Sequence, residues 1–472
     1  MGSFHVAKIG INRRSLIKGL ALSLAGGAAI YSGASVAQNA SGALLNLSQL
    51  RGSINATDRG LLPGVVSDQS KVLLEAIIET AATNQVLYLP AGDYYFSNID
   101  LPDNTRIQGV AGATRLIYTG RSHGLIAENA RRIELNDIMI DGANNQFSDY
   151  TNGLLQVRGC RRLHLNNISV LGSSKYGISL ERCGGVIQDC DLAGAADAAI
   201  YSVQAVGLTI RNNYVHDCAN GGILIHRWEI GEDNTIVSGN RIERILAQNG
   251  GTGPFGNGIN IFRAGNVKIS DNHISDCTFS AIRANSASNI HITGNSCYRS
   301  GETALYVEFA FQGAVVTGNL IDGGTIGISI ANFDKNGRLS VISGNLIRNI
   351  TDQGPYPAQG PGFGHGIAVE ADASVTGNTI ENVAKWGMLV GWGPYLRSVN
   401  ITGNVILKVP VGIAVSVVDG AQSTSIFTNI FDQTPRGTIV GHRWVEPVTK
   451  DLGTRSKSGF KHLAIGNNQV NQ

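Results

Sequence analysis

Short runs of alternating apolar and polar residues recur along most of the chain, and each is followed by a tight turn. The stretch 289–309 holds the whole pattern: a strand predicted at Ile290–Thr293, a turn at Gly294 and Asn295, and a later strand at 304–307. Alternation with a period of two is typical of β-strands, and Gly and Asn accept the left-handed backbone angles of tight turns. The pattern therefore predicts a chain built almost wholly from short strands.

The same turn returns at a nearly constant interval. A period of about 24 residues with two or three strands in each period is typical of a solenoid. Asparagine side chains at the same place in neighbouring turns can also hydrogen-bond to one another. A second register, Gly-Ile-x-Val and its variants, follows eight to ten residues after most turns, as at Gly258, Gly327, Gly366 and Gly412. The turn positions are Asn167, Cys190, Asn213, Asn240, Asn272, Asn295, Asn319, Asn345, Asn378, Asn404 and Asn429.

A helix is predicted ahead of the repeat. Asp68 is in the position of an N-cap, and the residues that follow it fall on one helical face: Val72, Leu73, Ala76, Ile77 and Thr80. Such a helix can cover the apolar end of a stack of strands. The sequence therefore predicts a lead-in at 38–62, a repeat domain of about 11–13 turns at 63–440 with a short helix capping its N-terminal end, and a C-terminal cap at 441–472.

The first 37 residues have the order of an export signal. Arg13, Arg14 and Lys18 precede a short Ala- and Gly-rich apolar run at 19–30, and small residues at 35–37 suit cleavage. Paired arginines with modest hydrophobicity indicate the twin-arginine route specifically. We therefore expect a signal peptide at 1–37, the twin-arginine translocase as a partner during export, a periplasmic or secreted protein, and no transmembrane anchor in the mature chain.

The charge and cysteine content of the chain argue against two classes of protein. The formal net charge is +2, and loss of the first 37 residues would remove four basic and no acidic side chains. The sequence offers no basic face of the kind that a phosphate backbone needs, so nucleic acid is not expected as a partner. The six cysteines form no Cys-x-x-Cys or zinc spacing, and we interpret them as small buried residues rather than a disulfide framework.

These features resemble a known superfamily. The repeats, together with segments 64–93 and 98–109, resemble the pectate-lyase-like right-handed parallel β-helix proteins. With the paired arginines in front, the whole chain resembles the uncharacterised twin-arginine-translocated repeat protein family. The resemblance implies an all-β fold, a single-stranded right-handed parallel β-helix with a short N-terminal capping helix. It does not fix an activity, because that superfamily contains lyases, hydrolases, epimerases, tailspikes and inert scaffolds.

One short motif looks like part of a catalytic signature. Gly364-His365-Gly366 is similar to a motif of the polygalacturonase hydrolases. The Asn-Thr-Asp-Gly, Asp-Asp and Arg-Ile-Lys segments that accompany it in those enzymes are absent, so we interpret the motif here as a coincidence. The signatures of mannuronan epimerases and of pectate lyases are also absent.

Polar side chains gather at the outward strand positions of the central turns. Aligning the turns predicts that His226, Asn260, Arg263, Arg283, Tyr306 and Glu308 meet within four turns. Two insertions, 247–256 and 351–364, leave the same corner of the turn, and the first borders this set. Insertions on one face of a solenoid often mark its binding face.

This set suits an acidic sugar. Arg283 would bind a uronate carboxylate through two hydrogen bonds, and Tyr306 or His226 would remove the proton on the carbon next to that carboxylate. Glu308 would orient the base or bind Ca²⁺ as a cofactor. We assign substrate-binding roles to Asn260, Arg263, Glu370, Trp386 and Trp392, the tryptophans by stacking on sugar rings. Glu308 and Glu370, two turns apart, also suit hydrolysis by paired carboxylates. Asp189, Asp191, His216 and Asp217 form a weaker candidate cation site.

Two hypotheses remain open from the sequence. In the first, an exported β-helix protein acts on acidic polysaccharide, by uronate lyase or epimerase chemistry. In the second, a non-catalytic envelope protein binds glycan or serves a structural role. The row of polar side chains on the central turns favours an enzyme. Any exposed strand face carries polar residues, however, so the same row is also compatible with a non-catalytic protein.

Overall fold

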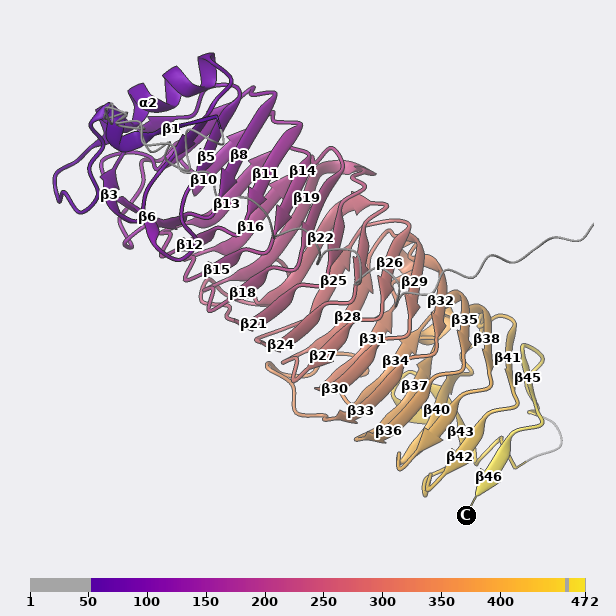
Figure 1. Ribbon diagram of the computed structural model, residues 1–472. Helices are drawn as coiled ribbons and strands as arrows, with labels where there is room; N and C mark the ends of the chain where they lie inside the picture. The colour runs from indigo at the N-terminus through magenta and orange to yellow at the C-terminus, as the bar shows by residue number, and fades with distance from the viewer. Residues whose placement is uncertain (1–51, 455–457, 472) are drawn as a thin grey trace, which may run out of the picture. The chain divides into compact units, whose positions relative to one another are not determined.

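The structure, a computed structural model, describes residues 52–454 and 458–471. Within them the chain winds into a right-handed parallel β-solenoid of about 14 turns (Figure 1). The predicted fold is confirmed, with more turns than the 11 to 13 counted from sequence. The difference arises because strands also pair outside 63–440: β1 with β2, β41 with β45 and β42 with β46. The predicted signal peptide, with Arg13 and Arg14, lies outside the described residues.

Each complete turn contributes one strand to each of three sheets, which run the length of the stack. Sheet A, with 16 strands in the described residues, has the order β1-β2-β5-β8-β11-β14-β17-β20-β23-β26-β29-β32-β35-β38-β41-β45. These strands are Ser53–Asn55, Val86–Tyr88, Thr105–Gln108, Arg132–Asn136, Arg162–Asn166, Gly185–Gln188, Leu208–Arg211, Ile236–Ser238, Lys268–Ser270, Ile290–Thr293, Gln312–Thr317, Arg338–Ser343, Ala371–Thr376, Arg397–Thr402, Thr424–Phe427 and Leu463–Gly466.

Sheet B follows the tight asparagine turn. It has the order β3-β6-β9-β12-β15-β18-β21-β24-β27-β30-β33-β36-β39-β42-β46. These strands are Gly92–Phe96, Thr114–Tyr118, Met139–Asp141, Ser169–Leu171, Asp191–Ala193, Tyr214–His216, Arg241–Ile245, His273–Cys277, Ser296–Tyr298, Leu320–Gly324, Leu346–Ile350, Thr379–Val383, Val405–Leu407, Ile430–Asp432 and Gln469–Asn471.

Sheet C carries the Gly-Ile-x-Val register. It has the order β4-β7-β10-β13-β16-β19-β22-β25-β28-β31-β34-β37-β40-β43-β44, and only its last pair, β43 with β44, is antiparallel. These strands are Ile99–Asp100, Leu125–Glu128, Gly153–Arg158, Tyr176–Glu181, Ala198–Val203, Gly221–Glu232, Asn257–Gly265, Ile282–Asn285, Thr303–Glu308, Ile326–Ile330, His365–Val369, Trp386–Val390, Val411–Ser416, Ile439–Arg443 and Glu446–Pro447.

The predicted capping helix is present as α2 (Ser70–Ala82), at the N-terminal end of the stack (Figure 1). Its residues Leu73, Ala76 and Ile77 are buried. The N-cap is Gln69 rather than Asp68, although the Asp68 carboxylate accepts the Ser70 backbone N–H at 2.8 Å. Short 3₁₀ helices are η1 (Ala56–Arg59), η2 (Phe333–Lys335) and η3 (Gly393–Tyr395). Among the described helices, none combines the length and apolar character needed to cross a membrane.

The repeated asparagines form a buried ladder at the turn from sheet A to sheet B. Each side-chain amide donates to the side-chain oxygen of the asparagine in the next turn at 2.9 to 3.0 Å. The ladder runs through Asn213, Asn240, Asn272, Asn295, Asn319, Asn345, Asn378, Asn404, Asn429 and Asn468. Assigning Asn167 to this position was wrong by one residue: Asn167 has a positive φ of 50°, and buried Ile168 takes the ladder position.

The interior of the solenoid is apolar and tightly packed. The isoleucines of the Gly-Ile strands, such as Ile259 and Ile367, are fully buried. The glycine before each isoleucine leaves no room for a side chain, since a Cβ at Gly366 would lie 2.4 Å from the Gly387 carbonyl oxygen. This packing explains the second glycine of the Gly364-His365-Gly366 motif without any catalytic role. All six cysteines are buried and unpaired, as predicted.

Candidate functional site

The outward positions of sheet C line up from turn to turn as the sequence alignment predicts. Asn260 pairs with Arg283, Arg283 with Tyr306, and Tyr306 with Ser329. Two residues further along the strands, His226 pairs with Phe262, and Asn285 pairs with Glu308. Adjacent parallel strands lie about 4.8 Å apart, so these side chains form one continuous strip, which we call the sheet C face.

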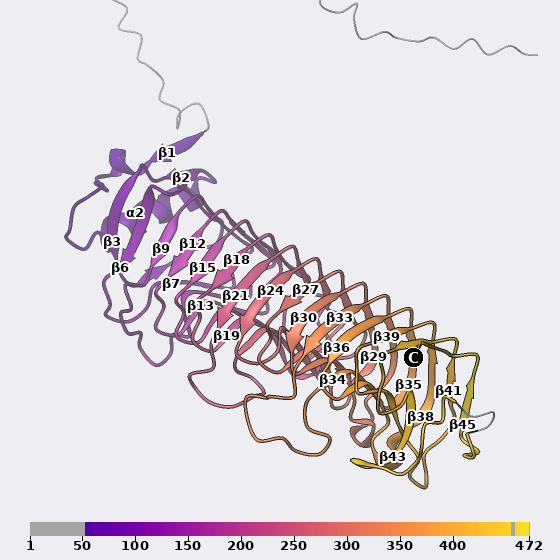
Figure 2. The same cartoon turned by 90° about the horizontal axis from the view of Figure 1, so that it is seen from below.

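Both insertions join sheet B to sheet C and fold over this face. Segment 247–256 connects β21 to β22, and segment 351–364 connects β33 to β34. Figure 2 shows loops projecting from the stack beside β19 and β34. Thr252 of the first insertion donates its hydroxyl to Glu302 at 2.8 Å, and the Tyr356 hydroxyl of the second also donates to Glu302. The two insertions are therefore held together on one carboxylate.

A buried charge cluster lies under the insertions. The Arg283 Nε donates to Glu308 Oε1 at 2.7 Å, and Arg283 Nη1 lies 3.7 Å from Glu302 Oε2. The exposed fractions are 7% for Arg283, 3% for Glu302 and 2% for Glu308. Burial works against the charged guanidinium, but the hydrogen bond and charge of Glu308 outweigh it and raise the pKa of Arg283. Arg283 is thus committed to protein carboxylates, which differs from the free uronate clamp expected from sequence.

Tyr306 lies beside this cluster and His226 lies at the other side of the first insertion, and burial favours the neutral form of both. Burial and the nearby Glu308 raise the pKa of the Tyr306 phenol, over whose ring the Arg283 guanidinium lies at 4.9 Å. Burial lowers the pKa of His226 to about 4, against the opposing hydrogen bond with Asn260. Near neutral pH the phenol therefore stays protonated and the imidazole stays uncharged.

A cavity of about 320 Å³ opens on the sheet C face beyond Tyr306. Glu302, Tyr356, Glu370 and Trp392 are among its lining residues. Glu370 follows the end of β34 and accepts the Phe333 backbone N–H at 2.6 Å. Burial raises the pKa of Glu370 to about 7. This carboxyl group is half-protonated near neutral pH and faces a cavity that also holds a second carboxyl, Glu302.

A smaller cavity of about 130 Å³ lies on the other side of the first insertion. Its lining includes Tyr176, Tyr201, His226 and Phe255. The rings of Tyr176 and Tyr201 stack at 4.7 Å with an interplanar angle of 17°. Asn260 holds this region closed, because it contacts His226 Nε2 at 3.2 Å and donates to the Gly253 carbonyl at 3.0 Å. Asn260 therefore supports the insertion rather than pointing freely outward.

Two residues assigned to substrate binding do not reach a cavity. The Arg263 guanidinium donates to the Trp228 carbonyl oxygen and lies 4.7 Å from the Phe262 ring, away from the cluster. Trp386 is 3% exposed, with the His365 ring stacked 4.8 Å away and the Lys385 ammonium 4.1 Å from its ring centre. Stacking of Trp386 on a sugar ring is therefore wrong for this arrangement, whereas Trp392 is only partly buried and lines the larger cavity.

The candidate cation sites are occupied by protein groups. His216 bonds to Asp191 at 3.0 Å and to Asp217 at 2.6 Å, and Asp217 also accepts from Arg244 at 2.7 Å. Glu308 accepts from Asn285 at 3.1 Å as well as from Arg283. Within residues 52–454 and 458–471, no group of three or more His, Cys, Asp or Glu side chains is arranged to hold a metal ion.

Sequence patterns missed three residues of the cluster: Glu302, Thr252 and Tyr356. Glu302 lies at the corner just before β28, outside the alternating positions, and the other two lie in the insertions. The presence of both insertions at the same corner was the only sequence signal that pointed to them. The repeat predicts where strands lie but not the path of an insertion that lacks the repeat. The contact of Thr252 and Tyr356 with Glu302 therefore became visible only in the structure.

The fold and this face define a right-handed parallel β-solenoid with loop-covered cavities on one sheet. A family model described as the right handed beta helix region matches residues 103–243, 152–278 and 231–442, so the chain belongs to that family. This membership supports the resemblance to the pectate-lyase-like superfamily, whereas the twin-arginine repeat family stays a prediction. No curated protein matches the sequence.

Solved structures share the fold at low identity. The pre-mature gene product 12 of bacteriophage phi29 is 15% identical with a TM-score of 0.53, and the match covers 84% of this chain and 58% of that one. The A-module of mannuronan C-5 epimerase AlgE6 from Azotobacter vinelandii is 16% identical with a TM-score of 0.43, covering 89% and 100%. PfbA, a surface adhesin of Streptococcus pneumoniae, is 14% identical with a TM-score of 0.42, covering 89% and 100%. At these identities the likeness concerns the fold alone.

Proposed function

We propose that the protein binds a polysaccharide chain along the sheet C face and hydrolyses a glycosidic bond in the larger cavity. The observation that carries this proposal is the Glu370 carboxyl, whose pKa is raised to about 7 by burial in a cavity shared with Glu302. A carboxylic acid that remains protonated near neutral pH can donate a proton to a leaving glycosidic oxygen. Aromatic side chains at both cavities, Trp392 and Tyr201, offer surfaces for sugar rings.

In this mechanism two carboxyls have different roles. Glu370 donates its proton to the departing oxygen, and Glu308 accepts a proton from the attacking water. The register places Glu308 at the same strand position as Glu370, two turns away and so about 10 Å along the stack, whereas Glu302 lies at the other end of the strands. A separation near 10 Å suits hydrolysis by a general acid and a general base on either side of the bond.

The uronate lyase or epimerase hypothesis receives less support. Its clamp, Arg283, is already bonded to Glu308 and lies near Glu302, so the cluster contains two carboxyls for one guanidinium. Such a surface repels a uronate carboxylate rather than attracting it. Of its two proposed bases, Tyr306 is held protonated by its raised pKa, and His226 bonds to Asn260 at the smaller cavity, apart from Arg283. We therefore propose a neutral glycan as the substrate of this face.

A second candidate function is glycan binding without turnover. Glu308 is 2% exposed and already accepts hydrogen bonds from Arg283 and Asn285, so water has little access to it in this structure. In that case the same aromatic surfaces bind the chain and no bond is cleaved.

We also propose that the protein acts outside the cytoplasm after export through the twin-arginine route, which the paired arginines support. Replacing Arg13 and Arg14 together with lysine is expected to leave the uncleaved precursor inside the cell. Fractionation with an antibody to the repeat domain would measure this. Normal export of the variant would contradict the proposal.

The test of hydrolysis is a screen of the purified protein on neutral and acidic polysaccharides, with reducing ends and unsaturated products measured together. We expect new reducing ends from a neutral glycan, lost by about 100-fold or more in Glu370→Gln, because general acid catalysis is worth that much. Glu381→Gln is the matched control, since Glu381 lies on sheet B and pairs with Lys408 at 2.7 Å.

The other outcomes separate the alternatives. Unsaturated product from a uronate polymer would contradict hydrolysis and restore the lyase hypothesis. A thermal shift with a glycan but no product would favour the binding module. Equal activity of Glu370→Gln and the parent would remove Glu370 from the mechanism.

A further inference from the structure

Four arginines meet at the N-terminal part of the solenoid, where the chain turns from sheet C into sheet A. Arg131 and Arg132 precede or begin β8, and Arg161 and Arg162 occupy the same places one turn later at β11. Arg132 pairs directly with Arg162 in the parallel register. Only the winding of the chain brings the two pairs together, since they lie about 30 residues apart in sequence.

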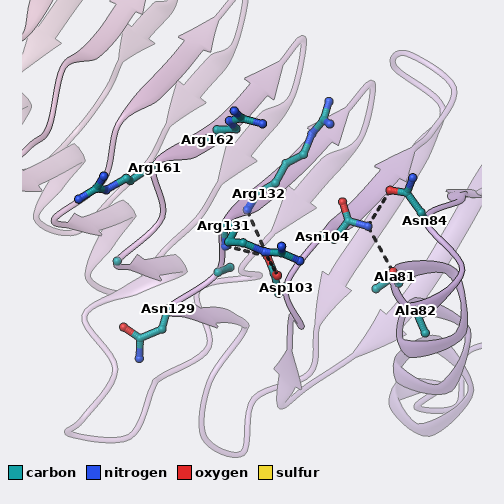
Figure 3. A pocket seen from close by; sticks show the side chains of 12 residues that line it. Ala81, Ala82, Asn84, Asp103, Asn104, Asn129, Arg131, Arg132, Arg161 and Arg162 are labelled. Atoms are coloured by element: carbon teal, nitrogen blue, oxygen red, sulfur yellow. Dashed lines mark hydrogen bonds and ion pairs between the residues drawn. The ribbon is translucent and has the colours of Figure 1, made fainter.

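The first pair has protein partners and the second pair has none. Arg131 Nε donates to Asp103 at 2.6 Å, and Arg132 Nε donates to Glu134 at 2.7 Å. Across residues 52–454 and 458–471, no hydrogen bond or ion pair involves the guanidinium of Arg161 or Arg162, and both residues are exposed. Figure 3 shows Arg131 bonded to Asp103, whereas Arg161 and Arg162 lie apart from any partner.

Arg162 adds a like charge at this corner. It lies directly opposite Arg132 on the neighbouring strand, about 4.8 Å away, and like charges in such a pair are destabilising, although Glu134 offsets part of the Arg132 charge. Among the described residues that line the cavity at this corner, Asp103 is the one acidic residue. An anion bound from outside would offset the repulsion, and a planar guanidinium binds carboxylate or sulfate with two hydrogen bonds.

The surface between these turns and the end of α2 is hollowed, with a cavity of about 980 Å³. A flat lipid surface does not reach into such a hollow. No aromatic side chain from the described part of the chain lines it, and single-stranded nucleic acids depend on aromatic stacking for much of their binding. The lining does contain Asn84 and Asn129, whose side-chain amides are suited to sugar hydroxyls, whereas the Asn104 amide already donates to Asn84 and to the Ala81 carbonyl.

We propose that this corner binds a chain of an acidic glycan, with carboxylate or sulfate groups seated on Arg161 and Arg162. Acidic groups of the glycan meet Arg161 and Arg162, because Arg131 and Arg132 of the preceding turn are already bonded to Asp103 and Glu134. The site is independent of the sheet C face and its neutral substrate. It would tether the protein to an acidic matrix while the sheet C face acts on another chain.

The experiment measures binding of the purified full chain to polygalacturonate, to dextran sulfate and to neutral dextran at low and at physiological salt. Arg161→Ala with Arg162→Ala is expected to weaken binding of an acidic glycan by about tenfold or more, as two charge-assisted contacts are lost. Arg436→Ala with Arg443→Ala is the matched control, because it removes the same charge from exposed arginines elsewhere. Arg161→Lys with Arg162→Lys should retain part of the affinity, since charge remains but the paired hydrogen bonds do not.

The outcomes decide the proposal in the following way. Preference for polygalacturonate or for dextran sulfate identifies the acidic group, and selective loss in the Arg161/Arg162 variant supports the site. Equal loss in the control variant would mean that net charge alone matters, which overturns it. Absence of binding to either acidic polymer at low salt overturns it as well. Equally tight binding to single-stranded DNA of similar charge would overturn the assignment to a glycan.

Discussion

Two buried polar networks run through this solenoid, and they differ in whether they repeat. The asparagine ladder places the same residue at the same turn from Asn213 to Asn468, and each amide is bonded on both sides. The cluster of Arg283, Glu302 and Glu308 occurs at one place, and side chains from two insertions complete it. The repeated ladder provides hydrogen-bond partners for buried backbone groups at every turn, which the fold requires. The charge cluster occurs once, so the fold does not require it. The contrast directs attention to the cluster as the functional region.

The largest effect on stability is expected from Arg283→Met. It leaves Glu302 and Glu308 buried without their cation, and breaking a buried ion pair in this way costs about 3–5 kcal/mol. Unfolding by urea would measure the loss. Adding Glu302→Gln and Glu308→Gln should recover most of it, because no buried charge then remains unpaired.

Arg299→Met is the control for that prediction. Arg299 bonds to Asp276 at 2.7 Å on an exposed surface, where the loss should stay below about 1 kcal/mol. Equal effects at Arg283 and Arg299 would show that the cluster is not an unusually costly feature of the fold.

Interrupting the ladder at Asn319→Ala should cost about 3 kcal/mol. The Asn319 side-chain oxygen accepts from the backbone N–H and from the amide of Asn295, and its own amide donates to the Ile292 carbonyl. Each buried group left without a partner costs about 1–3 kcal/mol. Asn400→Ala removes an exposed asparagine of β38 that accepts the Ser425 hydroxyl at 2.6 Å, and it should change stability by about 0.5 kcal/mol or less. A similar small change at Asn319 would contradict a structural role for the ladder.

Glu370 should make stability depend on pH with a definite sign. Its pKa is raised from 4.5 to about 7 in the folded protein, so the folded state binds more protons between these values. The stability that this carboxyl contributes is therefore greatest below pH 4.5 and falls as pH rises toward 7, by roughly 3 kcal/mol at most. Glu370→Gln lacks this fall, so it should gain relative to the parent at pH 8 compared with pH 4. Parallel stability curves for the two proteins would contradict the raised pKa.

The sequence was sufficient for what repeats and insufficient for what does not. The strand Ile290–Thr293 was predicted to the residue, and the register that places Arg283 beside Tyr306 followed from aligning the Gly-Ile strands. Burial of Trp386 was not predictable in full, because its register neighbour His365 covers only part of the ring and His442 of the irregular C-terminal segment covers another part. Glu302 was missed because it lies at a corner, where the alternation of inward and outward positions no longer applies.

The beginning of the ladder offers a final and smaller test. Cys190 occupies the ladder position one turn before Asn213, and its backbone N–H already donates to the Asn213 side-chain oxygen at 3.0 Å. Its thiol faces the carbonyls of Leu165 and Gln188, in the way that later ladder amides face theirs. Cys190→Asn should therefore extend the ladder and stabilise the protein by about 0.5–1 kcal/mol, the usual net value of an added hydrogen bond. Cys190→Ala, which adds no amide, should be slightly destabilising in the same urea titration. If both variants lose stability equally, then the ladder depends on more than the position of its amides, and the tight turn around Asn213 must differ from the one around Cys190.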